Sequence, residues 1–422
     1  MKIYFDSKSS DREKYIWNML GSLSGAFSSL VFSIAVNRFF GGNSGGIFAF
    51  AYSNSQLMYT IGTFEVRPYQ STDVSEKYRY DTYFWLRMIS CMIMIICSVV
   101  YTVCSSFSFE KAGVVLSLCG YRLMDAFSDL LAGRFQQKDR IDISGKICFI
   151  RIVFCTIVFL AAMVITKNLL ISCIILFAGS VAALWINEFR FIYVEDRRRY
   201  IFDLKSIFHL ITEVVPLFMG SFVMMYINNA SKYAINSMYS DEIQNIYNIL
   251  FMPAFVINLF SLFIFRPLLI KMALYREQRQ FDKLIMVILK IYFAIALITL
   301  ITVAGSAIVG IPILSILYNV NLDSYKKQLL LIMSCGGISA LMTFAYYCVT
   351  VLRQQRWLLI GYGAAFIVAL SVTRGLVRFM CIDGAILAYA LSIGLIVIIF
   401  SVVIFTVILK QMYIEKYVAK KR

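Results

Sequence analysis

The chain has 422 residues, of which 60% are hydrophobic and 15% are charged, and its formal net charge is +16. Soluble domains are usually about 45–50% apolar and about 25% charged, so this composition excludes an ordinary soluble domain and indicates a membrane protein. Net positive charge alone also fits a nucleic-acid-binding protein, but the placement of the basic residues argues against that partner.

Twelve apolar segments follow one another with short connections, and each is about long enough to cross a bilayer. Their approximate limits are 15–39, 45–64, 83–105, 112–133, 145–166, 169–189, 212–231, 245–265, 284–304, 327–350, 357–377 and 384–409. We therefore expect an all-α polytopic membrane protein of about twelve transmembrane helices. The first segment is too long for a signal peptide and leads directly into the second, so we interpret it as a permanent span.

Most of the lysines and arginines fall in alternate connections between these segments. With the N-terminus in the cytoplasm, this pattern obeys the positive-inside rule and also places the C-terminus there. The count assigns Arg67, Arg87 and Arg151 to the inner side. The rule explains the net positive charge of the chain without a nucleic-acid partner. It also supports twelve spans, because one missed span would invert half of the pattern.

A basic segment after the sixth apolar run divides the chain into two halves. We expect residues 1–192 to form an N-terminal six-helix bundle and residues 212–422 a C-terminal one. Residues 193–211, which contain Arg197, Arg198 and Arg199, are the expected cytoplasmic linker. In transporters built from two such repeats, the substrate site lies between the repeats near the middle of the membrane.

The fourth segment carries Arg122, Asp125 and Asp129, whose spacing puts them on one helical face. A charge facing lipid costs about 2.5–3.5 kcal/mol, so these side chains must face the protein interior or a wet cavity. In one interpretation, Arg122 binds an anionic substrate while Asp125 and Asp129 bind a coupling Na⁺ or H⁺. In the other, the three side chains form an internal ion-paired cluster that holds helices together.

Further polar side chains stand at the ends of the seventh and eleventh segments. A ligand with phosphate or sugar hydroxyl groups could be bound by Asn228, Asn229 and Lys232. Alternatively, Lys232 anchors the helix end at the membrane interface. Arg374 either lines the mouth of a basic cavity or extends towards lipid headgroups. Glu213 is a candidate ion-coupling site, although an acidic residue at a helix start is also favoured by the helix dipole.

The sequence contains no motif for catalysis. It has one histidine, His209, and no phosphate-binding loop or nucleophile elbow. The ten cysteines fall almost entirely within apolar segments and form no CxxC pair, so we interpret them as small packing residues. We therefore expect no enzyme, no metal site and no cofactor other than a coupling ion, Na⁺ or H⁺.

Three stretches of the first 270 residues have a distinctive order. Residues 62–73 contain Arg-Pro-Tyr-Gln-Ser-Thr-Asp, and residues 121–129 read Tyr-Arg-Leu-Met-Asp-Ala-Phe-Ser-Asp. Residues 226–235 include Asn-Asn-Ala-Ser-Lys-Tyr, and Met-Pro-Ala-Phe-Val follows at 252–256. Together they resemble bacterial oligosaccharide repeat-unit flippases of the Wzx type, in the polysaccharide branch of the MATE-like exporter superfamily. Ser231 departs from that pattern, which usually has proline there.

The resemblance implies a MATE-like fold in which two six-helix bundles form a V around a cavity. Such proteins move an undecaprenyl-diphosphate-linked oligosaccharide from the inner to the outer leaflet of the bacterial cytoplasmic membrane. The product serves O-antigen, capsule or exopolysaccharide assembly, with a polymerase and other assembly proteins as further partners. The diphosphate is anionic, so cations such as Arg122, Lys232 or Arg374 would be required in the cavity.

Two other functions remain open from the sequence. A MATE-type drug or cation antiporter would share the fold. The cavity carboxylates of such an antiporter should have no compensating cation beside them, whereas Asp125 here has Arg122 three residues before it. A polytopic polysaccharide polymerase would usually carry a large outer loop. The longest outer connection here, residues 305–326, is short.

Overall fold

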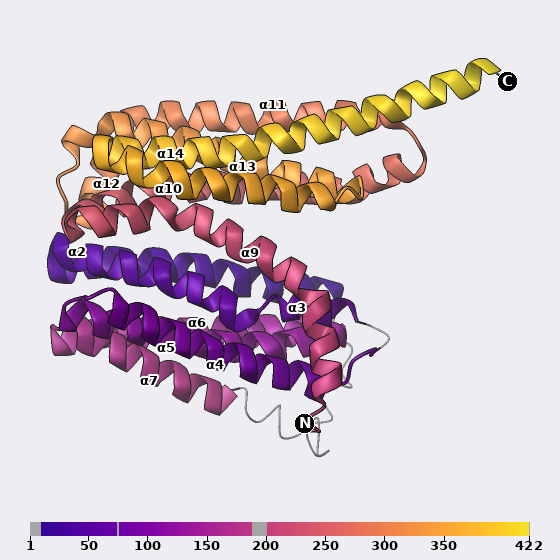
Figure 1. Ribbon diagram of the computed structural model, residues 1–422. Coiled ribbons are helices and arrows are strands. Elements are labelled where there is room, and N and C mark those ends of the chain that lie inside the picture. The colour runs from indigo at the N-terminus through magenta and orange to yellow at the C-terminus, as the bar shows by residue number, and fades with distance from the viewer. Residues whose placement is uncertain (1–9, 74–75, 188–200, 422) are drawn as a thin grey trace. The chain divides into compact units, whose positions relative to one another are not determined.

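The computed structural model describes residues 10–73, 76–187 and 201–421, and every regular element among them is helical (Figure 1). The α-helices are α2 (Asp11–Thr63), α3 (Val66–Thr72), α4 (Tyr80–Cys104), α5 (Phe109–Gln137), α6 (Ile141–Thr166), α7 (Leu169–Asn187), α9 (Leu204–Met238), α10 (Asp241–Glu277), α11 (Phe281–Gly305), α12 (Ile311–Tyr318), α13 (Lys326–Val351) and α14 (Arg356–Lys421). A π-helical turn, η1 (Ser306–Gly310), joins α11 to α12, and a 3-10 turn, η2 (Asp323–Tyr325), precedes α13. The predicted all-α class is confirmed for this part of the chain.

Eight of the described helices are long and apolar enough to cross a membrane. Apart from one or two terminal residues, each of the twelve predicted segments lies within one of the helices given above. Helix α5 is not among the eight, because Arg122, Asp125 and Asp129 interrupt its apolar run. Its ability to lie in a membrane therefore depends on how these three charges are neutralised.

Two pairs of predicted segments are joined by a single non-helical residue instead of a loop. Helix α2 contains the first two segments and breaks at Gly41, where φ is 82° and ψ is 179°. Glycine adopts this positive φ without the steric penalty of a side chain. Helix α14 contains the last two segments and breaks at Cys381, where φ is 48° and ψ is −120°.

The described chain divides into two compact units, Met1–Met225 and Tyr226–Arg422. Of the predicted linker, residues 193–211, the part up to residue 200 lies outside the described residues. Residues 204–211 form the first two turns of α9. The unit boundary falls inside α9 because its first half packs on the first unit. There Ile207, Leu210 and Val214 join a buried cluster with side chains of α3, α4 and α5, namely Val66, Tyr83, Leu86 and Leu130.

Within the first unit, α2 and α6 cross at glycines that permit close approach of the two backbones. A Cβ atom on Gly145 would lie 2.3 Å from the carbonyl oxygen of Trp17, and one on Gly21 would lie 3.0 Å from that of Gly145. Small residues commonly form such contacts between membrane helices, where van der Waals packing drives association. The rings of Phe32 on α2 and Phe159 on α6 add an edge-to-face contact with centroids 4.8 Å apart.

We predict that Gly145→Ala destabilises the first unit, because the new methyl group would overlap the backbone of α2. The expected loss of stability is about 1–3 kcal/mol, measured as a lower thermal unfolding midpoint in detergent. The matched control is Gly25→Ala, since a Cβ there would meet only Cδ1 of Ile152, at 3.8 Å. Equal midpoints for the two variants would contradict this account of the crossing.

Candidate functional site

Asp125 is the centre of an ion-paired group between α5 and α6. One carboxylate oxygen accepts a hydrogen bond of 2.7 Å from Arg122, three residues earlier on α5. The other oxygen pairs with Arg151 on α6, whose side chain is only 5% exposed. A single carboxylate therefore neutralises guanidinium groups from two helices.

Asp129, one turn further along α5, repeats this arrangement with different helices. Its carboxylate lies 2.9 Å from Arg87 of α4 and 3.2 Å from Arg67 of α3. The side chain of Arg87 is fully buried and also donates to the carbonyl oxygen of Gly62, at 2.8 Å. Charge-assisted hydrogen bonds of this kind offset the free-energy cost of removing an arginine side chain from water.

Arg122 is surrounded by tyrosines in addition to its carboxylate. It donates to the hydroxyl of Tyr52 on α2 at 2.6 Å, and its guanidinium carbon lies 4.8 Å from the centroid of that ring. The rings of Tyr59 and Tyr121 are 5.8 and 5.5 Å away. Cation–π attraction is strongest where water is excluded, and the Arg122 side chain is 17% exposed.

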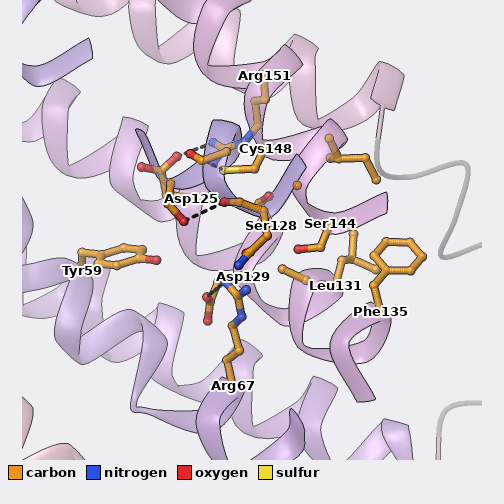
Figure 2. Close-up of a pocket in the computed structure, with 16 residues that line it drawn as sticks. Tyr59, Arg67, Asp125, Ser128, Asp129, Leu131, Phe135, Ser144, Cys148 and Arg151 are labelled. Carbon is orange, nitrogen blue, oxygen red and sulfur yellow. Dashed lines mark hydrogen bonds and ion pairs between the residues drawn. The ribbon is translucent and has the colours of Figure 1, made fainter. Parts of the chain in front are cut away.

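A cavity of about 210 Å³ lies beside these pairs within the first unit (Figure 2). It is lined by residues of α2, α3, α5 and α6, including Arg67, Asp125, Asp129 and Arg151. Figure 2 shows Tyr59 on one side and Ser144 and Phe135 on the other. The space is large enough for several water molecules or for a group of the size of a phosphate. Arg122 does not line it.

The charge around this cavity is unequal. Four guanidinium groups, those of Arg67, Arg87, Arg122 and Arg151, surround two carboxylates. In the ion pairs of the described residues, the guanidinium groups of this cluster therefore outnumber the carboxylates. Because each carboxylate is shared by two arginines, a bound anion would stabilise this arrangement more than a bound cation.

The structure brings together Arg122, Asp125 and Asp129, as their spacing predicts, and the first two form the ion pair of the second interpretation. The predicted roles in substrate binding and ion coupling remain predictions. The assignment of Arg87 and Arg151 to the inner side stays a prediction, and the structure adds that both are buried partners of α5. Their signal was present in the sequence, since each lies a few residues inside a predicted apolar segment.

Glu213 lies near the start of α9 and contacts the region around α3. Its carboxylate lies 2.6 Å from Nζ of Lys77 and accepts a hydrogen bond from the hydroxyl of Tyr69. The hydrogen bond to Glu213 raises the pKa of Lys77, and burial together with the same carboxylate raises the pKa of Tyr69 to about 12. A carboxylate held by two donors is a structural contact between α9 and α3.

The remaining predicted residues belong to the second unit. Asn229 is buried and Asn228 is half-buried on α9, while Arg374 is exposed on α14. Nζ of Lys232 lies 5.3 Å from the ring centroid of Phe251 on α10.

Ser231, which stands where the resembled pattern has proline, joins two helices of the second unit. Its hydroxyl donates to the carbonyl oxygen of Ala385 on α14 at 2.7 Å. Tyr239 of the same region donates to the carbonyl oxygens of Val377 and Arg378, at 3.1 and 3.2 Å, just before α14 breaks at Cys381. The departure from the pattern thus supplies a bond that proline has no group to make.

No protein-family model and no curated protein sequence matches this chain, but solved structures do. The lipid II flippase MurJ in an inward closed conformation is similar with a TM-score of 0.68, 14% identity, and coverage of 93% of this chain and 90% of that one. An inward-facing MATE multidrug transporter of the MOP superfamily is similar with a TM-score of 0.56, 12% identity and 97% coverage of both chains.

A third similar structure is a MOP superfamily transporter from Pyrococcus furiosus, reported to have a binding pocket of reverse polarity. It has a TM-score of 0.51, 12% identity, and coverage of 95% of this chain and 94% of that one. These similarities extend over nearly the whole chain, so the protein has the fold shared by MATE transporters and MurJ. With eight apolar helices of sufficient length among the described residues, it is a multi-pass membrane protein.

We predict that Asp125→Asn destabilises the protein by about 3–5 kcal/mol, because it leaves the charge of Arg151 buried without its carboxylate. Adding Arg151→Gln to that variant should restore about 1 kcal/mol or more, since the uncompensated charge is then removed. Thermal unfolding of the wild type, both single variants and the double variant measures this coupling. Additive effects of the two substitutions would show that the pair does not act as a unit.

Proposed function

We propose that this protein moves an undecaprenyl-diphosphate-linked oligosaccharide repeat unit from the inner to the outer leaflet of a bacterial cytoplasmic membrane. The transported unit would serve assembly of a surface polysaccharide, such as O-antigen, capsule or exopolysaccharide. Transport would proceed by alternating access, with a Na⁺ or H⁺ gradient as the energy source. In this proposal the chain crosses the membrane twelve times, as two six-helix bundles with both termini in the cytoplasm.

The observation that carries the proposal is the excess of guanidinium groups around Asp125 and Asp129. A transporter of organic cations needs carboxylates that are free to meet its substrate. Here each of the two carboxylates is already held by two arginines. A diphosphate provides negative charge and several acceptor oxygens, which guanidinium groups bind in a bidentate manner.

The fold supports the same class of substrate. Similar structures include both drug transporters and a flippase for lipid II, so the fold alone fits either function. The sequence adds three stretches that resemble oligosaccharide flippases, and two of these stretches contain residues of the polar cluster. The first stretch contains Arg67, and the second contains Arg122, Asp125 and Asp129. The fold and the cluster together favour an anionic, lipid-linked cargo.

The residues we propose to contact the substrate are of two kinds. Arg67 and Arg151 line the cavity of the first unit directly. Arg122 does not line this cavity but pairs with Asp125, which does. The proposed contacts of the second unit are Lys232, Arg374, Asn228 and Asn229. The side-chain amides of Asn228 and Asn229 and the ammonium group of Lys232 can donate hydrogen bonds to sugar hydroxyl and phosphate oxygens.

We predict that Arg67→Gln lowers the rate of translocation about tenfold, the equivalent of about 1.4 kcal/mol for a lost charge-assisted contact. Arg67 is suitable because Asp129 keeps its second partner, Arg87, in the variant. The measurement uses proteoliposomes that contain an undecaprenyl-diphosphate-linked oligosaccharide. A membrane-impermeant glycosidase reports how much of the sugar has reached the other leaflet.

The matched control is Arg79→Gln, which removes an arginine that is also paired with an aspartate, Asp81, but does not line the cavity. It should translocate like the wild type. If the wild type moves no lipid-linked sugar but expels organic cation dyes, the proposal is wrong and the antiporter alternative is favoured. Equal rates for Arg67→Gln and Arg79→Gln would contradict the role of the cavity.

A further inference from the structure

The second unit contains a run of buried amide side chains near the start of α10. Every residue from 244 to 250 is buried, and three of these seven are Gln244, Asn245 and Asn248. Gln244 and Asn245 have no exposed surface, and Asn248 is 4% exposed. A helix segment buried on all sides is usually hydrophobic all round, so the amides at these positions need a reason.

The amide of Gln244 lacks hydrogen-bond partners within the protein. Its Nε2 and Oε1 atoms are both buried, and neither finds a partner among the described residues. The same is true of Oδ1 of Asn236 on α9. Leaving a buried amide unpaired is costly, and buried polar groups of native proteins nearly always have partners. These atoms are therefore expected to bind water or a ligand.

These side chains lie on facing sides of two neighbouring helices. Only two residues separate α9 from α10, and Nζ of Lys232 on α9 lies 5.3 Å from the ring centroid of Phe251 on α10. Asn236 follows Lys232 by four residues, while Asn248 and Gln244 precede Phe251 by three and seven. Such spacings put the members of each set on one side of their helix. These five residues are the amide cluster.

Aromatic rings of three helices border the amide cluster. The ring of Phe251 lies 6.0 Å from that of Tyr247 and 5.2 Å from that of Tyr389 on α14. On α9, the rings of Tyr226 and Tyr233 are 6.0 Å apart. Sites for small organic ligands combine apolar and aromatic side chains with a few polar groups. The surroundings therefore suit a ligand with apolar faces as well as polar groups.

The unpaired atoms restrict the chemistry of that ligand. Oε1 of Gln244 and Oδ1 of Asn236 are acceptors, so their partner must supply hydrogen-bond donors. An ionised diphosphate accepts hydrogen bonds but has none to donate, and it would leave both oxygens unpaired. A hydroxyl group both donates and accepts, so two neighbouring hydroxyls satisfy both ends of one amide. The ligand chemistry is that of a polyhydroxylated molecule.

We propose that the amide cluster binds the hydroxyl groups of a sugar. Resting on the proposed function, this sugar belongs to the lipid-linked oligosaccharide whose diphosphate is bound by the arginines of the first unit. Lys232 and Asn236 are half-buried, so the cluster reaches the surface of the second unit on α9, and Gln244 lies fully buried beyond them. The sugar binds in the state of the transport cycle in which the cluster opens to it.

The test compares two lipids on the purified full-length protein in nanodiscs. One is undecaprenyl diphosphate, and the other is a pool of undecaprenyl-diphosphate-linked oligosaccharides extracted from the source cells. Native mass spectrometry measures which lipids the protein retains in competition. The wild type should prefer the sugar-bearing lipids about tenfold or more, as expected for one or two hydrogen bonds. Gln244→Leu should reduce this preference to about one.

The same variant separates a ligand site from a structural contact. Leucine is similar in size to glutamine and has no polar atoms in its side chain. Replacing an unpaired amide should therefore leave the thermal unfolding midpoint without added lipid unchanged or higher. A midpoint lower than that of the wild type would show that Gln244 is bound by structural water alone, and would overturn the proposal.

The matched control is Gln70→Leu in the first unit. Gln70 is also fully buried, and its Nε2 and Oε1 atoms also lack partners among the described residues. This variant should keep the preference for sugar-bearing lipids. The proposal is overturned if Gln244→Leu keeps the preference as well.

The outcomes also separate this inference from the proposed function. Equal retention of the two lipids by a wild type that translocates the sugar-bearing lipid overturns the sugar site and leaves the proposed function in place. A wild type that translocates no lipid-linked sugar overturns the proposed function. In that case, binding of the oligosaccharides released from the lipid, and its loss in Gln244→Leu, would still support the sugar site.

Discussion

The pairing of two carboxylates with four arginines is the interaction on which this structure depends. Helix α5 carries charges in its apolar run, and a membrane helix tolerates them only when partners from other helices neutralise them. Asp125 and Asp129 recruit those partners from α3, α4 and α6 as well as from α5 itself. The cluster therefore fixes four helices of the first unit around one polar centre and leaves positive charge in excess beside a cavity.

The first half of α9 is joined to this centre through a second set of contacts. Glu213 binds Lys77 and Tyr69, apolar side chains of α9 enter the core of the first unit, and the ring of Phe64 stacks on that of Phe218. The first half of α9 is therefore held against the helices that carry the arginine-rich cluster.

Much of the architecture was predictable because hydrophobic segment length and helical periodicity are strong signals in a membrane protein. The apolar segments and the common face of Arg122, Asp125 and Asp129 follow directly from spacing. The pairing of Arg87 and Arg151 with α5 was not predicted, because counting charges by side does not show which of them are buried against a neighbouring helix. The attachment of α9 to the first unit depends on tertiary contacts, which leave no periodic pattern in the sequence.

The most direct test of the central claim is whether the arginine-rich cluster binds a diphosphate. Binding of undecaprenyl diphosphate to the purified protein should be measured at several salt concentrations, with the uncharged alcohol undecaprenol as the reference. The account predicts that the diphosphate binds more tightly than the alcohol, that salt weakens this preference, and that Arg151→Gln abolishes it. Equal affinity of the wild type for the charged and uncharged lipids would contradict the account.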